Sequence, residues 1–261
     1  MKILKTLAAA ISMYTKIPMP HFDKDDEGYE RAIMFLPLVG ILIGAVMFII
    51  IRAFSLWRIS VYARAVFAVI IPLLITGGFH VDGFMDTVDV ISSYGSPEKK
   101  LEILKDPHIG SFAVIRFATA LLAMIGSVLV VLNIETKEEV PAFILACGTF
   151  AISRALASIT SVIMSKSKAE GMLVSETENA GGVCIFVAGI QLIAVLAFMA
   201  YLDAINTGVI LLAFALFTVY YGYMTKKNFG GVTGDTAGYY ITAGEMFAIL
   251  ALAASLVIRT L

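Results

Sequence analysis

Apolar residues fall in long runs along this chain, and short polar connections separate the runs. A membrane-spanning helix needs about 20 mostly apolar residues, and seven runs come near that length. They cover residues 33–51, 62–79, 110–132, 140–163, 183–202, 205–224 and 239–258. Within the first run, Gly40 and Gly44 have the small-residue spacing that lets two helices pack closely. The pattern predicts an all-α, polytopic integral membrane helix bundle of about seven transmembrane helices, forming a single domain over residues 1–261.

The first 20 residues, MKILKTLAAAISMYTKIPMP, combine positive charge with a short apolar stretch. They have the charge pattern of a short signal peptide, but no convincing cleavage site follows. We therefore expect an amphipathic helix that lies at the membrane interface and ends before Pro18 and Pro20.

The composition agrees with a membrane protein. Hydrophobic residues make up 59% of the chain and charged residues 15%, and the mean hydropathy is +0.91, values that are hard to reconcile with a soluble domain. The formal net charge of −1 provides no basic field that would attract nucleic acid. Cys147 and Cys184 both lie in apolar runs, which indicates small buried residues and neither a disulfide nor a metal knuckle.

Lysine and arginine in the connections predict the orientation, because cytoplasmic loops carry an excess of both. With the N-terminus in the cytoplasm, twelve of these residues fall inside and five outside. The three connections with unusual polar residues, 79–109, 165–182 and 225–238, then lie on the same side. We therefore expect a multi-pass protein of the cell (inner) membrane whose N-terminus and active site face the cytoplasm.

Acidic residues are concentrated between residues 77 and 110, directly after the second apolar run. If this segment is helical, Asp82, Asp86 and Asp89 lie within about 60° of one line on its surface. Three carboxylates on one face raise each other's pKa unless a cation is present, and an all-oxygen set favours Mg²⁺ or Mn²⁺. An acid-rich helix start is the simpler alternative, but acids beside a membrane core are costly without a function.

Two further features place polar groups near the membrane. Arg154 lies near the middle of the fourth run and needs an anion there, either the Asp cluster or a substrate phosphate. The loop NFGGVTGDTAG, residues 228–238, can bring backbone N–H groups close to a phosphate just before the last run. The candidate phosphate-binding residues are Gly230, Gly231, Thr233 and Gly234, and the candidate metal ligands that follow are Asp235 and Glu245.

His80 and His108 flank the acidic stretch, and each taken alone is expected to be a hydrogen-bonded structural residue. Lys105 and Asp106 precede Pro107, which ends a helix, so Lys105 is expected at the membrane surface near phosphate height. Clustered Asp, a lysine, an intramembrane arginine and a Gly-rich loop suit phosphoryl transfer from a diphosphate donor. No Gly-Lys-Ser/Thr motif is present, so ATP hydrolysis is not indicated.

Several segments together resemble one family of membrane enzymes. They are GGFHVDGFMDTVD, EILKDPHIGSF, the segment from Arg154 to Gly171-Met172, GGVTGDTAG with Glu245, and near the N-terminus TKIPMP and FLPLVGILIG. Over nearly its whole length the chain is similar to the adenosylcobinamide-GDP ribazoletransferases, also called cobalamin synthases. The resemblance implies transfer of cobinamide phosphate from its GDP conjugate to α-ribazole or its 5′-phosphate, with release of GMP and a requirement for Mg²⁺. One departure is Val90, where the family usually has Gly.

The resemblance carries the family's motif positions over to His80, Asp82, Asp86, Asp89, Lys105, Asp106, Arg154, Asp235 and Glu245. We expect the metal ligands to be Asp82, Asp86, Asp89, Asp235 and Glu245. We expect the catalytic residues to be Asp82, Asp86, Lys105, Asp106 and Arg154. Lys105 and Arg154 would meet phosphate charge, and Asp106 and Asp235 would each be either the base or a further ligand. His80 joins the phosphate-binding residues of the Gly-rich loop.

Two other functions fit part of the pattern. A CDP-alcohol phosphatidyltransferase is also Asp- and Mg-dependent, but its Asp-Gly is followed by an Ala-Arg pair that is missing after Asp82-Gly83. A cation or metabolite transporter would spread charged groups through the bilayer and contain inverted repeats, whereas this chain clusters its charges on one face. The expected partners are the small-molecule substrates and the lipid bilayer but no nucleic acid, and a homo-oligomer is left open.

Overall fold

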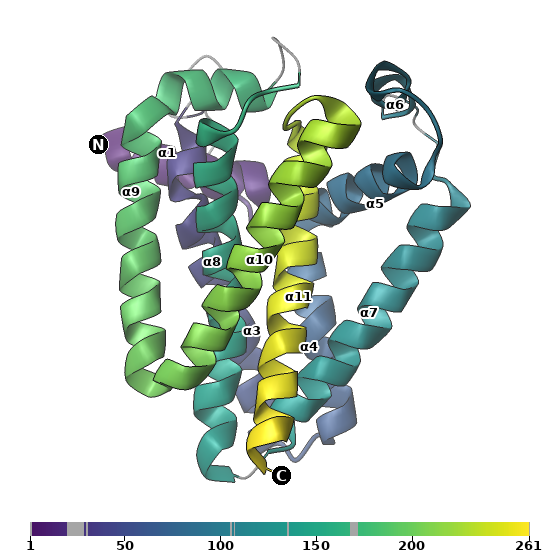
Figure 1. Ribbon diagram of the computed structural model, residues 1–261. Coiled ribbons are helices and arrows are strands. Elements are labelled where there is room, and N and C mark those ends of the chain that lie inside the picture. Colours follow the sequence, from purple (N-terminus) through teal and green to yellow (C-terminus); the bar gives the residue numbers. More distant parts are fainter. Residues whose placement is uncertain are drawn as a thin grey trace.

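The computed structural model describes residues 2–19, 29, 31–104, 106, 108–134, 136–167 and 172–260. Every regular element in these ranges is a helix, which confirms the all-α prediction (Figure 1). The elements are α1 (Lys2–Tyr14), the short 3₁₀ helix η1 (Ala32–Phe35), α3 (Leu36–Leu56), α4 (Val61–Thr76), α5 (Phe79–Ser92), α6 (Pro97–Ile103), α7 (Ser111–Leu132), α8 (Thr136–Ile163), α9 (Met172–Leu202), α10 (Ala204–Phe229) and α11 (Gly234–Thr260).

Six helical stretches in the described ranges are long and apolar enough to cross a membrane. They are Ala32–Leu56, Ser111–Leu132, Glu138–Ile163, Gly181–Leu202, Ala204–Phe229 and Gly234–Arg259. The helix pair α4 and α5 brings the count to seven if it is taken as one broken span. The prediction of about seven spans, together with a short apolar N-terminal helix, is therefore confirmed.

The second predicted span is interrupted where α4 ends. Gly77 and Gly78 have φ angles of 63° and 79°, in the left-handed region that favours glycine, so the helix stops at Thr76. The next helix, α5, is bent by 97° from α4 and runs across the bundle instead of along it (Figure 1). Val90 is an ordinary helical residue of α5, so its departure from the family's Gly leaves the backbone regular.

Glycines let α5 lie directly on α11. A Cβ atom at Gly83 would lie 2.7 Å from the Asp235 carbonyl oxygen, and one at Gly238 would lie 3.0 Å from the His80 carbonyl oxygen. The predicted close packing at Gly44 is also confirmed, because a Cβ there would lie 2.5 Å from the carbonyl oxygen of Cys147 in α8. Small residues thus place the acidic helix against the start of α11.

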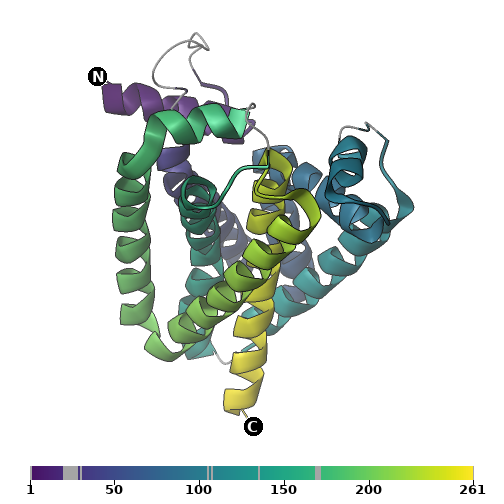
Figure 2. The same cartoon turned by 45° about the horizontal axis from the view of Figure 1, so that its top comes forward.

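The N-terminal helix and the start of α9 lie at the same end of the bundle as α5 and α6 (Figure 2). In α1, Ile3 and Leu4 are exposed while Ala10 and Tyr14 are buried, and the helix runs sideways to the bundle as an interfacial helix would. The start of α9 also runs sideways, because a kink at Gly181 with φ 45° separates it from the spanning part. This end of the bundle therefore has several helices that do not cross the membrane.

Candidate active site

The three acids of α5 share one helix face, because the segment that carries them is helical as predicted. Asp82 lines a cavity of about 240 Å³ that Asp235, at the start of α11, also lines. Asp86 and Asp89 line a separate small hollow beside the connection from α6 to α7. The Asp89 carboxylate lies so close to Gly110, the residue before α7, that a Cβ there would overlap it. The positive N-terminus of α7 therefore favours the charge of Asp89.

The negative charges of these acidic residues repel one another. The pKa of Asp86 is raised to about 6, first by partial burial and then by the neighbouring negative charges of Asp82, Asp235 and Asp89, in that order. A cation bound among these carboxylates would reverse this effect and hold Asp86 ionised. The contribution of Asp235 means that α11 adds its charge to the acidic face of α5.

Within the described ranges, no three residues among His, Cys, Asp and Glu are grouped closely enough to hold a metal ion. Mg²⁺ does not need such a group, because it usually takes one or two carboxylates and fills its other positions with waters and substrate phosphates. The cavity shared by Asp82 and Asp235 fits that mode of binding. The five ligands predicted from the sequence do not form one preformed cage, and their role in metal binding stays a prediction.

The connection between α6 and α7 holds Asp106 and His108 at the surface. The backbone N–H and the ring of His108 bond to Asp106 Oδ1, at 3.0 Å and 2.6 Å, and these bonds keep the pKa of Asp106 below its usual range. His108 is thus the hydrogen-bonded residue that we expected. Asp106 lines the hollow that contains Asp86, whereas Lys105 lies outside the described residues.

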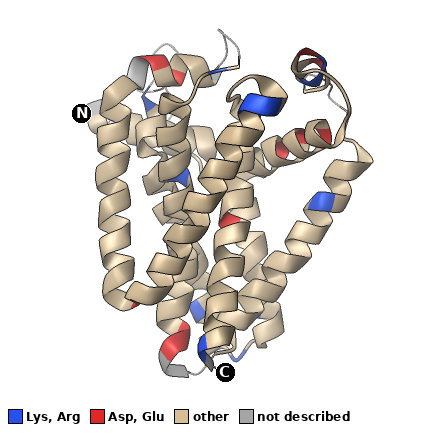
Figure 3. Cartoon of the chain, viewed as in Figure 1, with Lys and Arg blue, Asp and Glu red and all other residues tan. Residues whose placement is uncertain are grey.

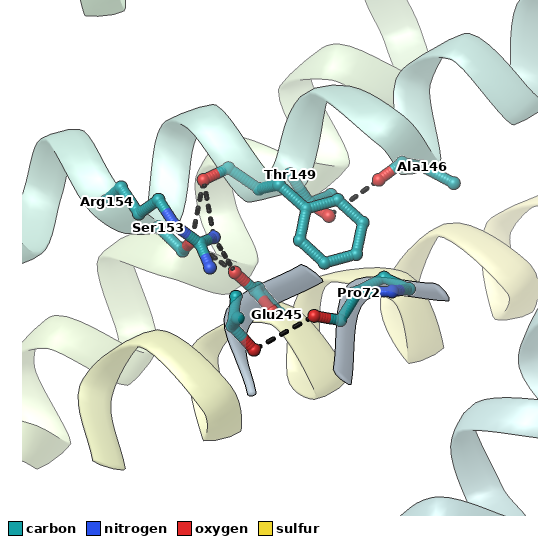
Figure 4. A network of polar contacts seen from close by, with 8 residues as sticks. Pro72, Ala146, Thr149, Ser153, Arg154 and Glu245 are labelled. Carbon is teal, nitrogen blue, oxygen red and sulfur yellow. Dashed lines mark hydrogen bonds and ion pairs between the residues drawn. The ribbon is translucent and has the colours of Figure 1, made fainter. Parts of the chain in front are cut away.

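Arg154 meets a carboxylate that differs from both expected partners. Its Nη1 lies 2.5 Å from Glu245 Oε1, and Ser153 Oγ donates a 2.7 Å hydrogen bond to the same oxygen (Figure 4). Arg154 and Glu245 are only 2% and 7% exposed, so they form a buried ion pair between α8 and α11. Neither an α5 aspartate nor a substrate phosphate is needed to neutralise this arginine. The metal-binding role of Glu245 and the phosphate-binding role of Arg154 stay predictions.

Several residues of the Gly-rich loop have structural roles. Gly230 ends α10 with φ 75°, and Gly231 packs on the backbone of residues 165–167. Thr233 and Thr236 cap α11 reciprocally, because each side-chain oxygen accepts a hydrogen bond from the other's backbone N–H, at 3.1 Å and 2.8 Å. Gly234 is exposed and open, so a phosphate can approach the start of α11 there.

His80 does not have the hydrogen bonds that we expected of it. The ring is 5% exposed, and its Nδ1 has no partner among the described residues. Burial lowers the pKa of His80 well below its usual value, and the positive charge of Arg154 adds to this effect. The ring lines both the Asp82 cavity and a smaller one, of about 60 Å³, beside Arg154 and Glu245.

The cavity shared by Asp82 and Asp235 also contains two residues that sequence reasoning missed. The Tyr14 hydroxyl, at the end of α1, donates one bifurcated hydrogen bond to the two carboxylate oxygens of Glu176, at the start of α9, with distances of 3.0 Å and 3.2 Å. Burial raises the pKa of Glu176 to about 7. The only signal in the sequence was the polar connection 165–182, which does not distinguish Glu176 from its acidic neighbours.

Known proteins match this chain over nearly its whole length. The model of the family described as cobalamin-5-phosphate synthase matches residues 6–253. A protein of Lachnoclostridium phytofermentans named adenosylcobinamide-GDP ribazoletransferase is 36% identical over 252 residues, 96% of this chain and 94% of that protein. Proteins with the same name from Clostridium botulinum and Shigella boydii are 29% and 31% identical, over 95% of this chain and 96% and 99% of their own lengths. No solved structure matches.

Proposed function

Because the chain belongs to the cobalamin-5-phosphate synthase family, we propose that it transfers the phosphocobinamide group of adenosylcobinamide-GDP to α-ribazole or α-ribazole 5′-phosphate. A ribose hydroxyl of the acceptor attacks the phosphorus on the cobinamide side of the diphosphate. The new P–O bond forms as the bond to the second phosphate breaks, GMP leaves, and the hydroxyl proton passes to a base. The family match does not favour a CDP-alcohol phosphatidyltransferase or a transporter.

The crossing of α5 and α11 is the observation that supports this site. It brings the aspartates of α5 within electrostatic reach of Asp235, and the open N-terminus of α11 lies beside them. A diphosphate placed here meets a helix N-terminus that favours anions. The acids alone would repel it, so the reaction needs a cation between them.

Asp82 and Asp235 would hold Mg²⁺, with Asp86 as a further ligand or as the base. When bound, the ion supplies charge neutralisation for the diphosphate and for the leaving phosphate. Asp106 lines the hollow beside Asp86 and is the other candidate for the proton acceptor. The hydrogen bonds from His108 keep the pKa of Asp106 below its usual range, which weakens Asp106 as a base.

The acidic end of the bundle is proposed to face the cytoplasm, with the protein in the cell (inner) membrane. Lys99, Lys100, Lys226 and Lys227 lie in α6 and in the last turn of α10, at this end. The excess of lysine supports the orientation by the positive-inside rule. A nucleotide-linked donor would then reach the site from the compartment in which nucleotides are made.

The test uses the purified full chain in lipid vesicles with adenosylcobinamide-GDP, α-ribazole and Mg²⁺. We expect GMP and the joined cobamide to appear in equal amounts, and neither to form when α-ribazole is omitted or Mg²⁺ is chelated. GMP without the cobamide would show hydrolysis instead of transfer. Absence of both products with all components present would refute the proposed function.

A further inference from the structure

The cavity that Asp82 and Asp235 share is lined by polar residues and by apolar residues. Its polar lining residues include Tyr14, His80, Ser161 and Glu176. Its apolar lining residues include Ile33, Leu36, Ala157, Leu173 and Ile241. The lining comes from α1, η1, α3, α5, α8, α9 and α11, so residues far apart in the sequence enclose one space.

One buried polar group among the lining residues has unused hydrogen-bonding capacity. The Glu176 carboxylate is 4% exposed and accepts one bifurcated hydrogen bond from the Tyr14 hydroxyl, although it can accept about four in all. Buried polar groups in native proteins are almost always hydrogen-bonded. A ligand that carries hydroxyl groups would use this capacity, since a hydroxyl can donate to the carboxylate.

The volume of the cavity favours the acceptor over the donor as its ligand. Its volume of about 240 Å³ lies just below the range of roughly 300–1,000 Å³ that is usual for small-molecule pockets. A corrinoid joined to GDP is far larger than such a space, whereas a single nucleoside is of the right order. The apolar part of the lining suits the base of such a nucleoside, and the polar part suits its ribose.

We propose that this cavity binds the acceptor nucleoside, with its base among the apolar residues and its ribose hydroxyls hydrogen-bonded to Glu176. The reacting hydroxyl then faces Asp82 and Asp235, where the diphosphate of the donor is bound. Tyr14 acts through Glu176 as a positioning residue, because its hydroxyl orients both carboxylate oxygens. This inference rests on the proposed function, because it names the place of one of its two substrates.

The first test compares Glu176→Gln with Glu178→Gln in the GMP-release assay. Glu178 is an exposed acid two residues further along the same helix, so it is a matched control for charge. We expect Glu176→Gln to raise the KM for α-ribazole by about tenfold, since one of the two acceptor oxygens of the buried carboxyl group is lost. The KM for adenosylcobinamide-GDP should stay unchanged, as should both KM values of Glu178→Gln. Tyr14→Phe should raise the KM for α-ribazole by a smaller factor with little change in kcat.

The second test fills the cavity and measures binding directly. Leu173→Trp places a larger side chain among the apolar lining residues and should weaken equilibrium binding of α-ribazole to the purified protein in vesicles without weakening donor binding. Suppose that the wild-type protein releases GMP but that Glu176→Gln and Leu173→Trp both bind α-ribazole as tightly as the wild type does. That result would overturn the cavity assignment. A wild-type protein that releases no GMP would instead contradict the proposed function. Binding of α-ribazole that Leu173→Trp weakens would still support the cavity in that case.

Discussion

Charged residues gather at both ends of the helix bundle (Figure 3), and the two ends differ in how these charges are paired. At the end away from α5, each described acid with an ion pair has arginine as its partner. Arg64 and Arg52 lie 3.0 Å and 3.8 Å from Glu139, and Arg259 lies 2.8 Å from Asp203. These charges neutralise one another, and the pairs connect neighbouring helices.

At the α5 end, no described basic side chain forms an ion pair with Asp82, Asp86 or Asp89. Partial burial and then the repulsion of the neighbouring acids raise the pKa of Asp86 instead. Charges that are balanced inside the protein stabilise its fold, whereas charges that are left unbalanced are available to bind a cation or substrate. The contrast predicts that substitutions at the α5 end change activity and that those at the opposite end change mainly stability.

The largest expected effect is on activity, at Asp82. We expect Asp82→Asn to lower the rate of GMP release by about 100-fold or more, since losing roughly 3 kcal/mol of metal-assisted stabilisation costs that factor. The thermal unfolding midpoint should not fall, because the substitution removes repulsion. Glu139→Gln, at the other end, is the matched control and should keep normal activity. Near-normal activity of Asp82→Asn would contradict the metal-site interpretation. It would also contradict the expected difference between the two ends in their effect on activity.

The ion pair between Arg154 and Glu245 lies between the two ends and should affect stability most. We expect Arg154→Met to lower the free energy of unfolding by about 3–5 kcal/mol, because Glu245 is then left buried without its partner. Replacing Glu245 by Met as well should recover much of this loss. Denaturant unfolding in detergent measures both variants. If the Arg154→Met protein is as stable as the wild type, the two side chains do not stabilise each other.

Stability should also depend on pH through Glu176. Its pKa in the folded protein, about 7, is above the ordinary value of 4.5, so the folded state binds the proton more tightly than the unfolded state does. The resulting stabilisation is fully present below about pH 4.5 and is lost as the pH rises through 7, by up to about 3 kcal/mol. Unfolding measured at pH 5 and pH 8 should show this fall in the wild type. A similar fall in Glu176→Gln would assign it to other groups.

The smallest effect is expected at the opposite end, for Arg259→Gln. Its ion pair with Asp203 is partly exposed, so losing it should cost at most about 1 kcal/mol of stability. High salt should reduce the difference from the wild type, since it screens exposed charges. GMP release should be unchanged. A large loss of activity would show that this end also contributes to the site.

Several parts of the site could be predicted because they depend on local sequence. The spacing of Asp82, Asp86 and Asp89 on a helix depends only on helical periodicity, and the helix is present. The close packing at Gly44 followed from its missing side chain. The partner of Arg154 could not be predicted, because Glu245 is 91 residues away and only helix packing brings the two together.

The sequence by itself determined which segments are helical, which of them can cross a membrane, and which helix carries the acids, because periodicity, hydropathy and chain breaks are local properties. Only the tertiary structure decided that α5 turns through 97° to lie against α11, that Glu245 neutralises Arg154, and that Tyr14 and Glu176 help to enclose a cavity beside Asp82. These outcomes depend on which helix faces pack together. That choice is made by the packing of the whole bundle and not by any one segment.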